Sequence, residues 1–266
     1  AMMLAAILLW NSGAMPLASA LMTLVVSFLV FSQVKLFGMG VSMLRLAAAA
    51  IDRTEETEQM PQMDVDGKDI TPDSHDIVFD HVSFSYEKKP ILHDITVTLP
   101  DKTTTAVIGP SGSGKTTFCN LVARFWDVDS GKVTIGGHDV REYTLESLMD
   151  QMSMVFQNVY LFADTIENNI KFGCPDATHE QVVEAAKKAC CDDFIEALPD
   201  GYNTVIGEGG ASLSGGEKQR ISIARAMLKD APIIILDEAT ANVDPENEDR
   251  LQQAIEALTR DKTILM

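Results

Sequence analysis

The chain has 266 residues, which is enough for one or two domains with a hydrophobic core. It carries 21 basic and 39 acidic side chains, and this net charge of −18 argues against a nucleic acid partner. The four cysteines, Cys119, Cys174, Cys190 and Cys191, lack the spacing of metal ligands and are typical of a reducing compartment.

The N-terminal part of the chain is apolar, and no charged residue occurs from Ala1 to Val34. Turn-forming residues at 11–16 divide this stretch, and the apolar segment that begins at Pro16 is long enough to span a bilayer. We therefore expect residues 1–51 to be a remnant of a transmembrane domain. In this interpretation Ala1–Trp10 is the end of a helix that starts upstream, and a full membrane helix follows it. A signal peptide and a buried core helix are the alternatives.

Three basic residues, Lys35, Arg45 and Arg53, follow the predicted span. By the positive-inside tendency, the C-terminal end of this helix is expected to face the cytoplasm. Residues 52–75 are polar and acidic and contain two prolines, which predicts a linker. Of the charged residues, 19 of the 21 basic and all 39 acidic ones lie in residues 51–266, a net charge of −20. A phosphate-binding site in such a domain must create its own positive potential.

The domain predicted at 76–266 begins with two segments of alternating apolar and polar residues, DIVFDHVSFSY and ILHDITVTL, which predict antiparallel strands. The segment TTTAVIG then predicts a buried strand, and it leads into GPSGSGKTT at 109–117 and a helical pattern. Strand, glycine loop and helix in this order indicate a P-loop.

The residues of the loop suit phosphate chemistry. Glycines allow backbone N–H groups to surround a phosphate, and the helix that follows adds the positive end of its dipole. Lys115 supplies a charge for the β- and γ-phosphates, and the Thr116 hydroxyl can ligate Mg²⁺. The predicted phosphate-binding residues are Gly109, Pro110, Ser111, Gly112, Ser113, Gly114, Lys115, Thr116 and Thr117.

The segment APIIILDEAT at 231–240 is an apolar run that ends in two carboxylates, Asp237 and Glu238. It is typical of a central parallel strand, at whose C-terminal end α/β sheets bind their ligands. Beside a P-loop, Asp237 is expected to hold Mg²⁺, and Glu238 to accept a proton from the attacking water. The alternative is a pair of surface acids at a strand end.

The stretch LSGGE at 213–217 precedes a helical pattern and lies upstream of the acidic strand. With GPSGSGKTT and IIILDE, it resembles the signature, Walker A and Walker B motifs of the ATP-binding-cassette (ABC) family. Gln157 resembles the Q-loop glutamine in a frame typical of exporters, TVIGEGG at 204–210 resembles an exporter loop, and ANVD at 241–244 resembles the D-loop. The resemblance covers the whole chain.

The resemblance implies an α/β P-loop NTPase with a parallel-sheet core, an antiparallel β subdomain and a helical subdomain, preceded by the membrane helix. It also implies ATP and Mg²⁺ as cofactors. Tyr86 would stack on adenine, Gln157 would bind the nucleotide and contact the metal, and Ser214, Gly215, Gly216 and Glu217 would close the site of a second cassette. Each assignment has a structural alternative. Tyr86 could form an ordinary cross-strand aromatic pair, Gln157 could be a surface loop residue, and the glycine pair could belong to a helix N-cap.

These observations predict the ATPase subunit of a membrane ABC exporter, with a second cassette, the membrane and a transported substrate as partners. Homodimer and heterodimer both remain open, as does import. In the family a histidine follows the next strand, and the sequence ends at Met266 before that position. We therefore expect an internal fragment of a longer transporter. The alternatives are a non-transport ABC ATPase and a chain that binds ATP but turns over poorly.

Overall fold

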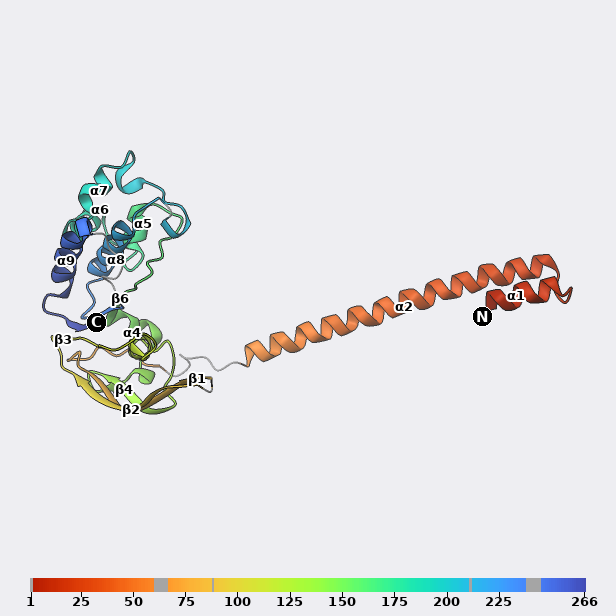
Figure 1. Cartoon of the computed structure of the whole chain (residues 1–266), viewed down its shortest axis with the longest axis horizontal. Helices are drawn as coiled ribbons and strands as arrows, with labels where there is room; N and C mark the ends of the chain where they lie inside the picture. Colours follow the sequence, from red (N-terminus) through yellow and green to blue (C-terminus); the bar gives the residue numbers. More distant parts are fainter. Residues whose placement is uncertain (1, 60–66, 88, 211, 238–244) are drawn as a thin grey trace. The chain divides into compact units, whose positions relative to one another are not determined.

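The computed structural model describes residues 2–59, 67–87, 89–210, 212–237 and 245–266. The chain divides into two units, Ala1–Gln62 and Met63–Met266, which are described separately (Figure 1).

The first unit is a helical hairpin. Helix α1 (Met2–Asn11) lies alongside the start of helix α2 (Leu17–Glu58), and Pro16 precedes the first turn of α2 with φ −66° (Figure 1). Proline is favoured at such a helix start because it has no N–H to leave unpaired. Within the described residues, α2 is the helix that is long and apolar enough to cross a membrane.

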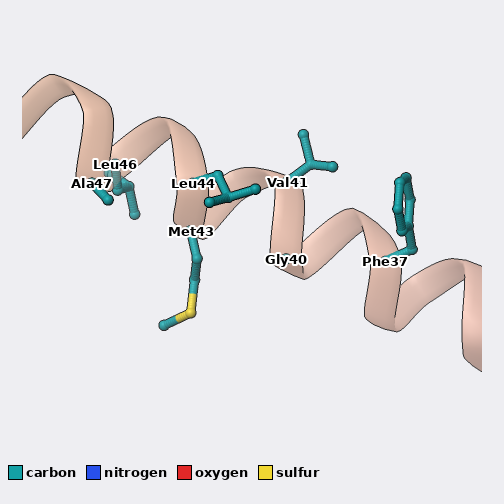
Figure 2. A pocket seen from close by; sticks show the side chains of 7 residues that line it. All are labelled: Phe37, Gly40, Val41, Met43, Leu44, Leu46 and Ala47. Carbon is teal, nitrogen blue, oxygen red and sulfur yellow. The ribbon is translucent and has the colours of Figure 1, made fainter.

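The first half of α2, from Leu17 to Val34, is without charged residues, and the charged residues of the helix follow from Lys35 onward. Small side chains, Ala6, Ala20 and Ser27, are the buried ones among the described residues of the hairpin, whereas Phe28, Phe31 and most other large apolar side chains are exposed. Figure 2 shows the side chains that line a pocket on this helix, all of which come from α2 between Phe37 and Ala47. A helical segment that is apolar all round is typical of a membrane span or of the core of a large assembly.

The second unit contains an antiparallel sheet with the strand order β2-β1-β4-β5. Strands β1 (Ile77–Tyr86) and β2 (Lys89–Leu99) form the expected hairpin, and β4 (Ser130–Ile135) and β5 (His138–Asp139) extend it. The apolar residues of β1 are buried, and Phe79 stacks on Phe118 of helix α3 (Lys115–Val122) at 4.0 Å between ring centroids. The antiparallel subdomain is thus packed against the helix that follows the P-loop.

A parallel sheet has the order β3-β8-β7-β6, formed by β3 (Thr104–Thr105), β8 (Thr263–Leu265), β7 (Ile233–Leu236) and β6 (Met152–Val155). Its central strand β7 alternates between two hydrophobic cores. Ile233 and Ile235 pack with α3 and the antiparallel sheet, whereas Ile234 and Leu236 pack with the helices of the other subdomain. Because both faces of the sheet are covered, β7 is apolar at every position.

The helical subdomain contains α5 (Ile166–Lys171), α6 (His179–Lys188), α7 (Asp192–Glu196), α8 (Gly215–Lys229) and α9 (Pro245–Thr259). Helix α4 (Leu145–Asp150) precedes β6, and 3₁₀ turns occur at Val140–Glu142, Gly201–Asn203 and Glu208–Gly210. Figure 1 shows α5 to α9 at one end of this unit, the antiparallel sheet at the other end, and β3 and β6 between them. This arrangement confirms the predicted fold class.

The structure differs from the predicted linker at both ends. Helix α2 continues to Glu58, because the sequence after residue 51 consists largely of helix formers and has no proline before Pro61. At the other end, the backbone N–H of Lys68 donates to Glu142 O (2.8 Å), and that of Ile70 donates to Ser147 Oγ (2.9 Å). Lys68 and Ile70 are therefore an integral part of the second unit.

The predicted buried strand TTTAVIG is also different in the structure. Only Thr104 and Thr105 are assigned to β3, and Ile108 is 93% exposed. The reason is the position of β3 at the edge of the sheet, where β8 is its one partner among the described strands.

Candidate functional site

The loop that connects β3 to α3 adopts a conformation that only glycine tolerates at two positions. Gly112 has φ +79°, and Gly114, which precedes the first residue of α3, has φ +96°. A Cβ atom at Gly109 would lie 2.6 Å from Ser113 Oγ, so a side chain at this position would require the Ser113 side chain to move. The glycines of GPSGSGKTT therefore shape a loop whose backbone leads directly into the N-terminus of α3.

Two distant parts of the sequence meet beside this loop. The Thr116 hydroxyl lies 3.2 Å from Asp237 Oδ1, although the two residues are 121 positions apart. Thr116 lies in the first turn of α3, and Asp237 directly follows β7. A hydroxyl and a carboxylate from these two elements form the kind of hard oxygen pair that Mg²⁺ prefers.

Gln157 reaches the same region because β6 runs parallel to β7. The register pairs Val155 with Leu236, and the Asp237 N–H donates to Val155 O at 3.0 Å. The residues that follow these two strands, Gln157 and Asp237, are therefore brought to the same edge of the sheet.

A pocket of about 380 Å³ lies at the P-loop. It is lined by Lys89, Ile91, Ser111, Gly112, Gly114, Lys115, Thr116, Thr117 and Gln157. Gln157 and most of the loop residues were expected from the sequence. Lys89 and Ile91 were not, although the hairpin register that pairs Lys89 with Tyr86 could have indicated them.

Lys115 is turned toward its own loop. Its ammonium group donates to the carbonyl oxygen of Gly109 at 3.0 Å and to that of Pro110 at 3.4 Å. The charge is thus held at the glycine loop, where an anion bound by the backbone N–H groups would meet it.

Tyr86 does not line this pocket. It is half-buried, and its ring lies edge-on to Phe84 (4.9 Å between centroids) and to Trp126 (5.3 Å). Phe84 is on the same strand as Tyr86 and Trp126 follows α3, so these contacts are aromatic packing but not the cross-strand pair considered as the alternative. The cross-strand partner of Tyr86 is Lys89, at the tip of the hairpin.

Ser214 caps helix α8. Its hydroxyl accepts from the Glu217 N–H at 3.3 Å, and Glu217 Oε2 accepts from the Ser214 N–H at 2.8 Å, which is a capping box. Ser214 and Gly215 are exposed and Gly216 is buried. In the described part of the chain, residues 213–217 are not among those that line the P-loop pocket, so the structure does not bring the two groups together.

Residues 92–241 match the family described as ABC transporter. The chain belongs to the ABC transporter family.

Individual relatives of this ABC chain are longer than the chain itself. An ATP-dependent lipid A-core flippase of Desulfotalea psychrophila is 46% identical over 224 residues, which are 84% of this chain and 38% of the relative. A protein of Bacillus subtilis, whose provisional name is multidrug export ATP-binding/permease protein YgaD, is 49% identical over 189 residues, 70% of this chain and 33% of the relative. The chain thus spans about a third of the length of these proteins.

A solved structure of a bacterial Atm1-family ABC exporter with ATP bound superimposes with a TM-score of 0.77 at 31% identity. The match covers 99% of this chain and 47% of that one. It therefore includes both the helical hairpin and the ABC domain, which confirms the resemblance to exporters.

Two predicted elements of the ABC site, Glu238 and the D-loop at 241–244, lie outside the described residues.

The cysteines behave as expected for small apolar residues. Burial, assisted by the charge of Asp237, raises the pKa of Cys119 to about 12, and burial raises that of Cys191 to about 12. Both thiols are therefore neutral at physiological pH, which does not suit a nucleophile or a metal ligand.

Proposed function

We propose that this chain is the ATP-binding and ATP-hydrolysing part of a membrane ABC transporter that exports a small molecule, a lipid or a peptide. The observation that carries the proposal is the 3.2 Å contact between Thr116 Oγ1 and Asp237 Oδ1, which joins the P-loop to the end of β7. Structural interactions alone do not explain why a hydroxyl, a carboxylate, an amide and a lysine gather at a glycine loop.

The residues of the pocket have separate roles in this proposal. The backbone N–H groups from Ser111 to Thr117 bind the phosphates, and Lys115 neutralises the β- and γ-phosphates. Glu238 accepts the proton of the water that attacks the γ-phosphorus, so that ADP and phosphate are released. Tyr86 provides a surface for the adenine ring.

The donor set fits Mg²⁺. Thr116, Asp237 and Gln157 offer hydroxyl, carboxylate and amide oxygen, directly or through water, and the 3.2 Å contact already brings the first two together. The ion would supply charge neutralisation at the phosphates.

The signature motif is proposed to act on the nucleotide of a second cassette. A Cβ atom at Gly215 would have no heavy atom of the described residues within 4 Å, and Gly215 does not have a positive φ. Neither packing against the described residues nor backbone conformation therefore requires glycine there. A close approach by a phosphate from outside the chain gives a reason for it.

The membrane and the cytoplasm are the proposed environments of the two units. The apolar surface of α2 supports insertion into a bilayer, and the basic residues after it support a cytoplasmic ABC domain. The proposed cargo is a class, a small molecule, lipid or peptide, because relatives with 46% and 49% identity are named for different cargoes.

The first test is nucleotide binding by the whole chain in detergent or lipid nanodiscs. Calorimetry is expected to show ATP binding that Mg²⁺ strengthens. Lys115→Ala should weaken it about 10- to 100-fold, the contribution of a hydrogen bond to a charged group. Thr116→Val should remove the effect of Mg²⁺, whereas Thr116→Ser should keep it.

The control is Lys132→Ala, which removes an exposed lysine on β4 that is paired with Asp80. Phosphate release should fall in Lys115→Ala together with binding. If the wild-type chain does not bind MgATP, or if Lys115→Ala binds it unchanged, the proposed function is wrong.

A further inference from the structure

We propose that Lys89 binds the α-phosphate of the nucleotide. This inference rests on the proposed ATP site and deepens it, because it adds a second positive side chain to the pocket and assigns that side chain to a particular phosphate. Lys89 is exposed, lies at the start of β2 and lines the P-loop pocket together with Lys115.

The packing of the β1–β2 hairpin places Lys89 there. The side chains that follow it in β2, Ile91 and Leu92, come so close to the P-loop that a Cβ atom at Gly114 would lie 3.1 Å from Ile91 Cγ2 and 3.1 Å from Leu92 Cδ2. The loop and the beginning of β2 are therefore in direct contact, and the pocket includes a residue on each side of Pro90.

The position of Lys89 in the hairpin indicates which phosphate it binds. Lys89 is the cross-strand partner of Tyr86, the proposed surface for adenine, whereas Lys115 belongs to the loop proposed for the β- and γ-phosphates. The part of a nucleotide that lies between adenine and the β-phosphate is the ribose with the α-phosphate. Of these, the α-phosphate is the anionic group that an ammonium binds.

The charge environment of Lys89 supports the same assignment. Several other lysines of this domain pair with carboxylates, for example Lys132 with Asp80 and Lys262 with Asp230. Among the described residues, no carboxylate oxygen lies within 4.0 Å of the Lys89 ammonium. In a region with a net charge of −20, a lysine that forms no ion pair with a described residue and lines a phosphate pocket is available for an anionic ligand.

The test measures Kd values for MgATP and MgADP by calorimetry with the whole chain in nanodiscs. The variants are Lys89→Gln, Lys89→Arg and the control Lys132→Gln, which changes the net charge equally on the same sheet but outside the pocket. Lys89→Gln should lower the affinities for MgATP and MgADP by the same factor, roughly three- to tenfold. This range lies between the effect of an exposed ion pair and that of a charge-assisted hydrogen bond. Lys89→Arg should restore binding.

Other outcomes overturn the inference. If Lys89→Gln binds both nucleotides as tightly as the wild type, Lys89 does not contact the nucleotide. If only the affinity for ATP falls, Lys89 binds the γ-phosphate instead. An equal loss in Lys132→Gln would show a general field effect and no contact. These results differ from a failure of the proposed function, in which the wild-type chain itself does not bind ATP. Since Lys89 is exposed, thermal unfolding of the Lys89→Gln variant should match that of the wild type.

Discussion

His81 on β1 and Asp94 on β2 face each other with 2.6 Å between Nδ1 and Oδ1, and both have a positive φ, 52° and 48°. The hydrogen bond to Asp94 and, after it, the charge of Asp94 raise the pKa of His81 above its ordinary value of 6.5, with a smaller effect from Asp80. A raised pKa means that the folded state holds the proton more tightly than the unfolded state. The pair therefore adds stability below pH 6.5, and this contribution disappears as the pH rises through the pKa of folded His81.

Replacing Asp94 with Asn tests this pair. We expect the titration midpoint of His81, followed by NMR of the histidine ring protons and assigned with a His81→Gln variant, to move down in Asp94→Asn. The melting temperature of the variant should depend less on pH between 5 and 8 than that of the wild type. The same midpoint in both proteins would show that the hydrogen bond does not exist in solution.

At the scale of elements, helix α8 is connected to both ends of the loop that carries Gln157. The buried Gln219 donates from Nε2 to Phe156 O at 3.3 Å, next to Gln157. At the other end, Arg225 donates to Asn169 O at 2.8 Å, and the Asn169 side chain pairs with the backbone of Phe162. The helix that Ser214 caps is thus hydrogen-bonded to both ends of the segment that contains Gln157.

Removing the hydrogen bond from Gln219 should make residues 156–162 open more often, without affecting α3. In Gln219→Ala we expect amides of residues 156–162 to exchange with deuterium about 2- to 12-fold faster, corresponding to one hydrogen bond of 0.5–1.5 kcal/mol. Amides of α3 should be unchanged. Gln252→Ala, an exposed glutamine on α9, is the control, and equal exchange in the loop of all three proteins would contradict the connection.

The elements that could be predicted from the sequence are those with a strong local pattern. The alternating residues of β1 and β2, the apolar run of β7 and the glycine loop each specify a local conformation, so the sequence indicated the fold class and the P-loop. For Lys89 and Ile91 the only signal was indirect, the pairing of Lys89 with Tyr86 in the hairpin, because their place in the site depends on which strand lies against the loop. The exposure of Ile108 likewise depends on the strand order, which no local pattern reveals.

At the scale of the whole molecule, the proposed arrangement needs a second cassette, and Gly215 permits a test that leaves the fold intact. Aspartate near a helix N-terminus stabilises the helix, so Gly215→Asp should not harm α8. The same carboxylate would repel the phosphates of a partner's nucleotide.

We therefore expect Gly215→Asp to bind MgATP like the wild type. Its affinity for forming the ATP-dependent dimer should fall about tenfold or more, since like charges in contact cost several kcal/mol. Sedimentation in detergent, in a Glu238→Gln background that slows hydrolysis, measures the dimer. Gly207→Asp is the matched control, because none of the described residues has a heavy atom within 4 Å of a Cβ atom at Gly207. Dimers of Gly215→Asp as stable as those of the control would exclude the role in trans.

The alternation of β7 between two hydrophobic cores has a consequence for how this domain melts. Because Ile233 and Ile235 belong to one core and Ile234 and Leu236 to the other, neither core can come apart while the strand stays in place. The helical subdomain and the phosphate-binding half are therefore expected to unfold in a single cooperative transition. A cavity made far from the nucleotide, for instance at Val182 in α6, would then lower the midpoint at which the P-loop itself is lost.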